Sequence, residues 1–126
     1  RPLGAMQDVA GRHPSSFAGW LCDLDWAIGP VLQLALVGDP SGPGFAELGR
    51  PAFSRYLPRL VVAGGNPDTP RHPALLAGRT MIDGQPTAYL CRQFSCQLPV
   101  TEPGDLERQL EDSNSPPPAE LPASRV

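Results

Sequence analysis

The sequence predicts a mixed α/β fold, made of an amphipathic helix, a small strand–helix–strand unit and a C-terminal β-hairpin. Three observations support this prediction. Apolar residues recur at helical spacing after Ser16, two short apolar runs flank a second helical pattern, and a tight-turn signal precedes a strand with alternating faces. The 17 prolines and 13 glycines among 126 residues interrupt the chain often, so long regular elements are not expected.

The amphipathic helix is predicted to begin with Ser16 as its N-cap and to end at Gly29-Pro30, a helix-stop signal. One apolar stripe is formed by residues at i, i+3, i+4, i+7 and i+11, namely Phe17, Trp20, Leu21, Leu24 and Ile28. Residues 1–14 are expected to be a flexible segment. Because the chain begins with Arg1 rather than an initiator methionine, we expect it to be a partial chain.

The strand–helix–strand unit follows. Val31–Val37 is a nearly continuous apolar run, typical of a strand covered on both faces, and is predicted to be the central strand. Arg59–Ala63 is a second short strand, and the helical pattern between them favours a parallel crossover. Pro51 lies within that helical pattern, so we expect either a break or kink there, or a helix that begins near Pro51.

The C-terminal hairpin is predicted from Asp83-Gly84, a reversal signal, followed by a strand over Thr87–Cys91. Thr87 and Tyr89 would lie on one face of this strand, with Ala88 and Leu90 on the other. A short helix is expected over Leu106–Glu111, because its first turn is acidic. The domain prediction is therefore a module over residues 15–112 and a disordered, proline-rich tail over residues 113–126.

Cys91 and Cys96 are the candidate redox residues. Residues five apart on an uninterrupted strand point to opposite faces, so the two sulfurs can meet only if the chain turns near Gln93 and Phe94. Such a turn is not indicated by the residue types, and structural thiols are the favoured interpretation, with a disulfide or redox pair as the alternative. Cys22 is interpreted as a packing residue. An odd number of cysteines, three, favours a reduced cytosolic setting.

Composition excludes several function classes. A net charge of −3 without any lysine gives no basic surface that would attract nucleic acid or anionic lipid. No stretch of the sequence approaches the ~20 apolar residues that are needed to cross a bilayer. The loop Gly38–Gly44 lies where α/β folds bind phosphate, but its prolines lack the N–H groups that hold an anion. The histidines, His13 and His72, lack a spacing typical of zinc. We therefore predict no catalytic, cofactor-binding or metal residue.

A longer pattern carries a family resemblance. Residues 75–100 and their continuation read L-L-A-G-R-T-x-I-D-G-x-P-T-A-Y-L-C-x-x-F-x-C-x-x-P-V-T-x-P. This run resembles the carboxy-terminal end of the YyaL-like, spermatogenesis-associated thioredoxin-domain proteins, and the match extends back through residues 55–58, 36–40 and 17–30. The resemblance implies a fragment from the end of an α/α six-hairpin barrel, similar to glycosidases, whose parent also has a thioredoxin-like domain.

The resemblance implies a non-catalytic C-terminal module, without cofactor, whose partner is the rest of the parent barrel. The parent would be a cytoplasmic protein linked to carbohydrate metabolism. Two alternatives stay open. One is a small thiol redox module that uses Cys91 and Cys96. The other is a protein-interaction piece that exposes Trp20, Leu24 and Ile28 as an apolar face.

Overall fold

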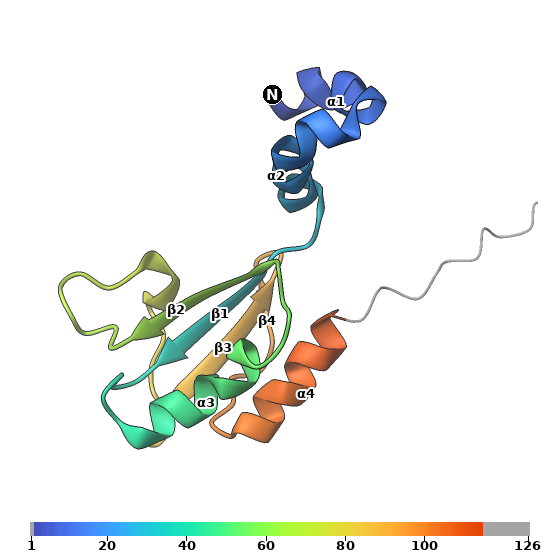
Figure 1. The fold of residues 1–126 in the computed structure, drawn as a ribbon. Helices are drawn as coiled ribbons and strands as arrows, with labels where there is room; N and C mark the ends of the chain where they lie inside the picture. The colour runs from blue at the N-terminus through green and yellow to red at the C-terminus, as the bar shows by residue number, and fades with distance from the viewer. Residues whose placement is uncertain (1, 115–126) are drawn as a thin grey trace, which may run out of the picture. The chain divides into compact units, whose positions relative to one another are not determined.

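The computed structural model describes residues 2–114 and confirms the mixed α/β class. The chain divides into two compact units, Arg1–Val31 and Leu32–Val126 (Figure 1). The first unit is helical, and the second contains a four-stranded sheet. The predicted division into residues 1–14, 15–112 and 113–126 stays a prediction, and most of the predicted tail lies outside the described residues.

The first unit contains α1 (Pro2–Arg12), the 3-10 helix η1 (Pro14–Phe17) and α2 (Ala18–Ile28). The predicted N-cap is wrong. Ser16 lies inside η1, where its N–H donates to the His13 carbonyl at 3.1 Å, so Phe17 becomes the N-cap of α2 without a capping side chain. The predicted end is confirmed, because the Gly29 N–H donates to the Asp25 carbonyl at 2.9 Å and Gly29 itself is extended.

The apolar stripe of α2 is only partly covered. No residue of α2 is buried. Trp20, Leu21 and Leu24 are half-buried, whereas Ile28 is 76% exposed. The helical spacing was therefore predicted correctly, but within the described residues the face that it defines lacks a full packing partner.

The sheet of the second unit has the order β2-β1-β3-β4, with bounds Leu60–Gly65, Leu32–Val37, Thr87–Arg92 and Ser95–Cys96. The strand β1 is parallel to β2 and antiparallel to β3, and β3 is antiparallel to β4. This confirms β1 as an interior strand and confirms the parallel crossover from β1 through a helix to β2. Five of the six residues of β1 are buried, as expected for a strand with both faces covered.

The crossover helix α3 spans Pro43–Phe53, so the expectation of a break at Pro51, or of a helix that begins there, is wrong, whereas the expected kink stays a prediction. Pro43 occupies the first turn, where a missing N–H costs nothing. Pro51 lies in the last turn, where its missing N–H leaves a single carbonyl, that of Glu47, without an intrahelical donor. The Ser54 N–H then donates to the Arg50 carbonyl at 3.0 Å and closes the helix.

One face of the sheet packs against α3 and α4, and α4 spans Pro103–Asn114 (Figure 1). We call this the helix face. The predicted helix over residues 106–111 is confirmed and extends further at both ends. The buried core on this face is rich in leucine and consists of Leu32, Leu34, Leu36, Leu48, Ala52, Ala88, Leu90, Leu106 and Leu110. Ala88 and Leu90 thus lie together on one face of β3, as predicted.

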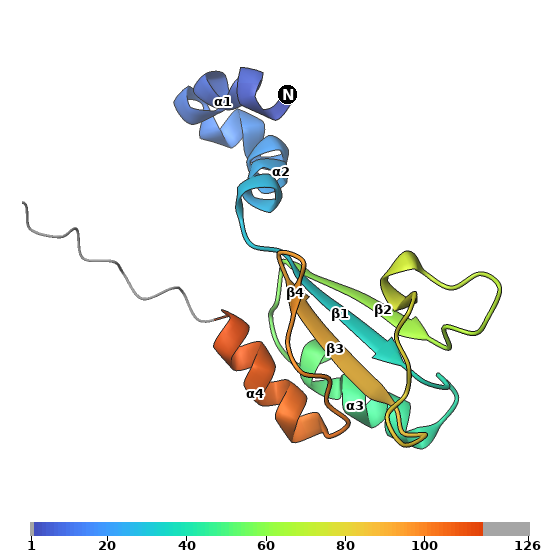
Figure 2. The same cartoon turned by 180° about the vertical axis from the view of Figure 1, so that it is seen from behind.

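The opposite face of the sheet, which we call the loop face, is covered by the 3-10 helix η2 (Ala74–Leu76) rather than by an α-helix (Figure 2). Its smaller cluster consists of Ala35, Val37 and Leu76, with Ala63, Leu75 and Tyr89 packed against them. The predicted turn at Asp83-Gly84 leads into β3, with φ values of 51° and 72°. The fully buried Thr87 hydroxyl fastens this turn, since it donates to the Gln85 carbonyl and accepts from the Ile82 N–H, each at 2.9 Å.

Candidate functional site

Cys91 and Cys96 are joined by a disulfide, with an S–S distance of 2.03 Å. The favoured interpretation of separate structural thiols is therefore wrong, and the disulfide alternative is correct. The chain turns at Gln93 and Phe94, whose φ values are 49° and 66°. Turns with two positive φ values are normally formed by Asn and Gly, so the residue types did not reveal this one.

The register of the hairpin explains why the two sulfurs meet. Cys91 lies directly opposite Cys96 across β3 and β4. The next pair is hydrogen-bonded, since the Gln97 N–H donates to the Leu90 carbonyl at 2.9 Å. The cysteines therefore occupy a non-hydrogen-bonded position, where opposing residues approach most closely, and their Cα atoms lie 3.9 Å apart.

The two halves of the disulfide differ in burial. Cys91 is 2% exposed and lies on β3, an interior strand of the sheet. Cys96 is exposed and lies on β4, the two-residue strand at the edge. The disulfide thus joins a buried cysteine, Cys91, to an exposed one, Cys96, on the edge strand of the sheet.

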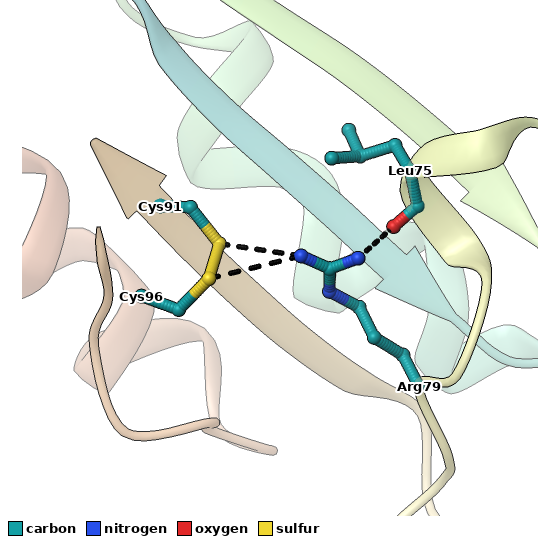
Figure 3. Close-up of a disulfide and its surroundings, with 4 residues drawn as sticks. All are labelled: Leu75, Arg79, Cys91 and Cys96. Atoms are coloured by element: carbon teal, nitrogen blue, oxygen red, sulfur yellow. Dashed lines mark hydrogen bonds between the residues drawn. A yellow bond between two sulfur atoms is a disulfide. The ribbon is translucent and has the colours of Figure 1, made fainter. Parts of the chain in front are cut away.

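Arg79 lies beside the disulfide (Figure 3). Its Nη2 atom is 3.4 Å from the Cys91 sulfur and 3.7 Å from the Cys96 sulfur, while Nη1 donates to the Leu75 carbonyl. The guanidinium carbon lies 5.7 Å from the centre of the Tyr89 ring, within the range of a cation–π contact. The Tyr89 hydroxyl in turn donates to the Thr80 carbonyl at 2.7 Å, so the ring that supports the guanidinium is itself held.

A guanidinium is charged at every relevant pH, and a nearby fixed cation stabilises a thiolate relative to a thiol. The arrangement can therefore support thiol–disulfide exchange. Sequence reasoning missed Arg79, although it stands within the run of residues 75–100. Arg79 and Cys91 are twelve positions apart in the sequence, and the chain reversal at Asp83-Gly84 lies between them.

The remaining candidates do not gather into a site. Among residues 2–114, no group of three His, Cys, Asp or Glu side chains could hold a metal ion. His72 contacts the Thr69 carbonyl in its own loop at 2.9 Å. Cys22 is a free, exposed thiol, so its interpretation as a packing residue is wrong, because it lies off the apolar stripe of α2. No helix within residues 2–114 combines the length and apolarity that a bilayer span requires.

The Gly38–Gly44 loop uses its own polar groups. The Ser41 N–H donates to the Asp39 carboxylate and the Gly42 N–H to the Asp39 carbonyl, each at 2.9 Å. The Phe45 N–H donates to the Gly42 carbonyl at 3.2 Å. These amides are directed into the loop, which agrees with a connecting role.

The fold and the site define a small α/β module whose terminal hairpin is closed by a disulfide beside an arginine. The chain is similar to human spermatogenesis-associated protein 20, with 29% identity over 82 residues, which is 62% of this chain and 10% of the human protein. The rat protein of the same name is 27% identical over 82 residues, with the same coverage of both chains. These similarities agree with the resemblance to the spermatogenesis-associated proteins that the sequence pattern predicted.

The chain spans about a tenth of the length of these curated relatives. No protein-family model matches the chain, and no solved structure matches it.

Proposed function

We propose that this chain is the non-catalytic C-terminal module of a larger protein that combines a thioredoxin-like domain with a six-hairpin, glycosidase-like barrel. The parent is a cytoplasmic protein linked to carbohydrate metabolism. The chain's similarity to one tenth of its curated relatives supports the modular part of this proposal. The observation on which the proposal rests is the partly uncovered apolar stripe of α2, which suits a helix that packs against the rest of the barrel.

The stripe has the composition of a buried surface. Leu24 is half-buried and Ile28 is 76% exposed within the described residues. Complete burial of one such side chain contributes about 1.5–3 kcal/mol. In the parent this burial would fasten α2 to neighbouring barrel helices. In the separate chain the same face is partly exposed, with Ile28 exposed and Trp20 and Leu24 half-buried, and such an apolar patch would promote self-association.

The test uses the full-length gene product with the double substitution Leu24→Glu and Ile28→Glu. If the stripe is buried in the parent, the variant loses about 3–6 kcal/mol of unfolding free energy and binds a hydrophobic dye. The matched control is Cys22→Glu, an exposed position on the same helix that lies off the stripe. Equal stability of the double variant and the control would contradict the packing role.

The disulfide supports a second candidate function, a small thiol redox module that uses Cys91 and Cys96. The supporting observation is Arg79, whose guanidinium contacts both sulfurs. Thiol titration of the folded chain tests this function. We expect one free thiol, Cys22, before reduction and three afterwards, with the circular dichroism spectrum retained and the change reversed on reoxidation. Three titratable thiols with and without reductant would exclude the redox function.

A further inference from the structure

We infer that the two sulfurs have different roles in exchange: the incoming thiolate attacks Cys96, and Cys91 departs as the thiolate beside Arg79. This inference rests on the redox function proposed above. It concerns the direction of the reaction, which is defined by the unequal burial of the two cysteines. The fixed guanidinium beside them stabilises the thiolate that departs.

Access selects the sulfur that is attacked. A thiolate must reach a disulfide sulfur directly, and exchange depends on which sulfur is accessible. Cys91 is 2% exposed, on a strand with neighbours on both sides. Cys96 is exposed on the edge strand β4, where no further strand follows among the described residues. Attack at Cys96 therefore requires no movement of the sheet.

Burial alone would make Cys91 a poor leaving group, because a buried thiolate loses its hydration. Arg79 offsets this cost, since its Nη2 lies 3.4 Å from the Cys91 sulfur. The guanidinium is held by the Leu75 carbonyl and the Tyr89 ring, so it does not need to be recruited during the reaction. Arg79 is also 3.7 Å from the Cys96 sulfur, so its charge would aid the departure of either sulfur. Access to Cys96 decides which sulfur is attacked, and the other sulfur, that of Cys91, therefore departs.

The exchange proceeds in two steps with a dithiol as reductant. In the first step, one thiolate of the dithiol forms a bond to the Cys96 sulfur, and the Cys91–Cys96 bond breaks with its electron pair passing to Cys91. In the second step, the other thiol of the reductant loses its proton and attacks the mixed disulfide, which releases the Cys96 thiolate. The protein disulfide is reduced by two electrons, and the dithiol is oxidised to a disulfide.

The direction is tested by trapping the first step in the full chain with Cys22→Ser, which removes the free thiol. The folded protein is treated briefly with reduced glutathione, quenched with acid, alkylated and mapped by mass spectrometry. We expect glutathione on Cys96 and the alkyl group on Cys91, in an excess of about tenfold or more over the opposite pattern. Equal labelling, or glutathione mainly on Cys91, would overturn the inference.

Arg79 is tested in the same background with dithiothreitol as the probe. Arg79→Gln should slow reduction of the disulfide about tenfold, and Arg79→Lys should restore part of the rate because it keeps the charge. The matched control is Arg92→Gln. Arg92 is adjacent to Cys91, but alternation along β3 places it on the helix face, so its loss should leave the rate unchanged. Equal rates for Arg79→Gln and Arg92→Gln would remove Arg79 from the mechanism.

The two proposals fail in distinguishable ways. If dithiothreitol does not reduce the disulfide while the chain stays folded, the redox function itself is wrong, and the inference falls with it. If the disulfide is reduced reversibly but glutathione is found on Cys91, the redox function survives and only the assigned direction is wrong. Thermal unfolding of each variant checks that a rate change does not reflect loss of the fold.

Discussion

The two faces of the same sheet are built differently. The helix face is covered by α3 and α4 and buries large side chains, among them Leu34, Leu48 and Leu106, each at most 1% exposed. The loop face has a smaller cluster, with Ala35, Val37 and Leu76 as its buried residues, and its cover is a 3-10 turn. The disulfide and Arg79 lie on the loop face. There the segment that covers the sheet is held by hydrogen bonds, from Arg79 to the Leu75 carbonyl and from Tyr89 to the Thr80 carbonyl, rather than by packed α-helices.

The difference is encoded by alternation along β3. Leu90 and Cys91 are neighbours in sequence, yet Leu90 belongs to the leucine core while the Cys91 sulfur contacts Arg79. Successive side chains of a strand point to opposite faces, so one strand can stabilise the fold with one set of residues and present reactive groups with the other. The comparison therefore predicts that stability depends chiefly on the helix face and exchange chemistry on the loop face.

The largest stability effect is expected on the helix face. Leu90→Ala removes a side chain that is 1% exposed and leaves a cavity between the sheet and its helices. Such substitutions typically cost about 3 kcal/mol, within a range of roughly 2–5 kcal/mol. Urea unfolding monitored by circular dichroism measures the change. The matched control is Leu98→Ala, at a side chain that is 83% exposed, which should change stability by less than about 0.5 kcal/mol.

If Leu90→Ala were no more destabilising than Leu98→Ala, the helix face would not be the main source of stability. A retained disulfide in the Leu90→Ala variant, checked by thiol titration, ensures that the two faces are compared separately. Reduction rates of the two variants should match while the folded state is populated, because neither substitution touches Arg79.

An intermediate effect is expected from the disulfide. The double substitution Cys91→Ser and Cys96→Ser opens a crosslink between residues separated by five positions. A loop this short restricts the unfolded chain only modestly, so the loss should be about 2 kcal/mol in the chain-entropy account. The same urea experiment measures it. A loss equal to or larger than that of Leu90→Ala would reverse the ranking of the two faces.

Much of the fold could be predicted because each prediction used a local signal. Apolar runs marked β1 and β2, and Asp83-Gly84 marked the turn into β3, since glycine accepts the positive φ observed there. The errors also have local causes. The residues around Pro51 do not show that α3 ends two residues later, and those around Ser16 do not reveal the 3-10 turn that contains it.

The candidate site could be predicted only in part, because its geometry depends on contacts between distant residues. Cys91 and Cys96 were selected from their residue type, but their bond depends on a turn at Gln93 and Phe94, two residues that rarely adopt positive φ. Arg79 reaches the disulfide through the register of β3 and the path of the η2 loop. Neither feature has a periodic or spacing signal in the sequence.

The smallest effect is expected at the solvent-facing rim of the helix face. Arg55 donates to the carboxylates of Glu107 and Glu111, the latter at 2.9 Å, and so links the end of α3 to α4. The hydrogen bond to Glu107, followed by that to Glu111, raises the pKa of Arg55 above its ordinary value. A raised pKa means that the stabilisation is fully present below the unfolded-state value and is lost only at strongly alkaline pH.

Arg55→Gln should therefore lower the urea midpoint less than either preceding variant, by an amount that stays constant from about pH 6 to pH 9. Both carboxylates are accessible to solvent, so salt at about 1 M, where the Debye length falls to about 3 Å, should remove most of the difference from the unsubstituted chain. Arg108→Gln is the control, since its partner Asp105 lies on the same helix and does not join α3 to α4. A salt-independent loss at Arg55 as large as that of Leu90→Ala would mean that the rim, and not the leucine core, fastens α4 to the sheet.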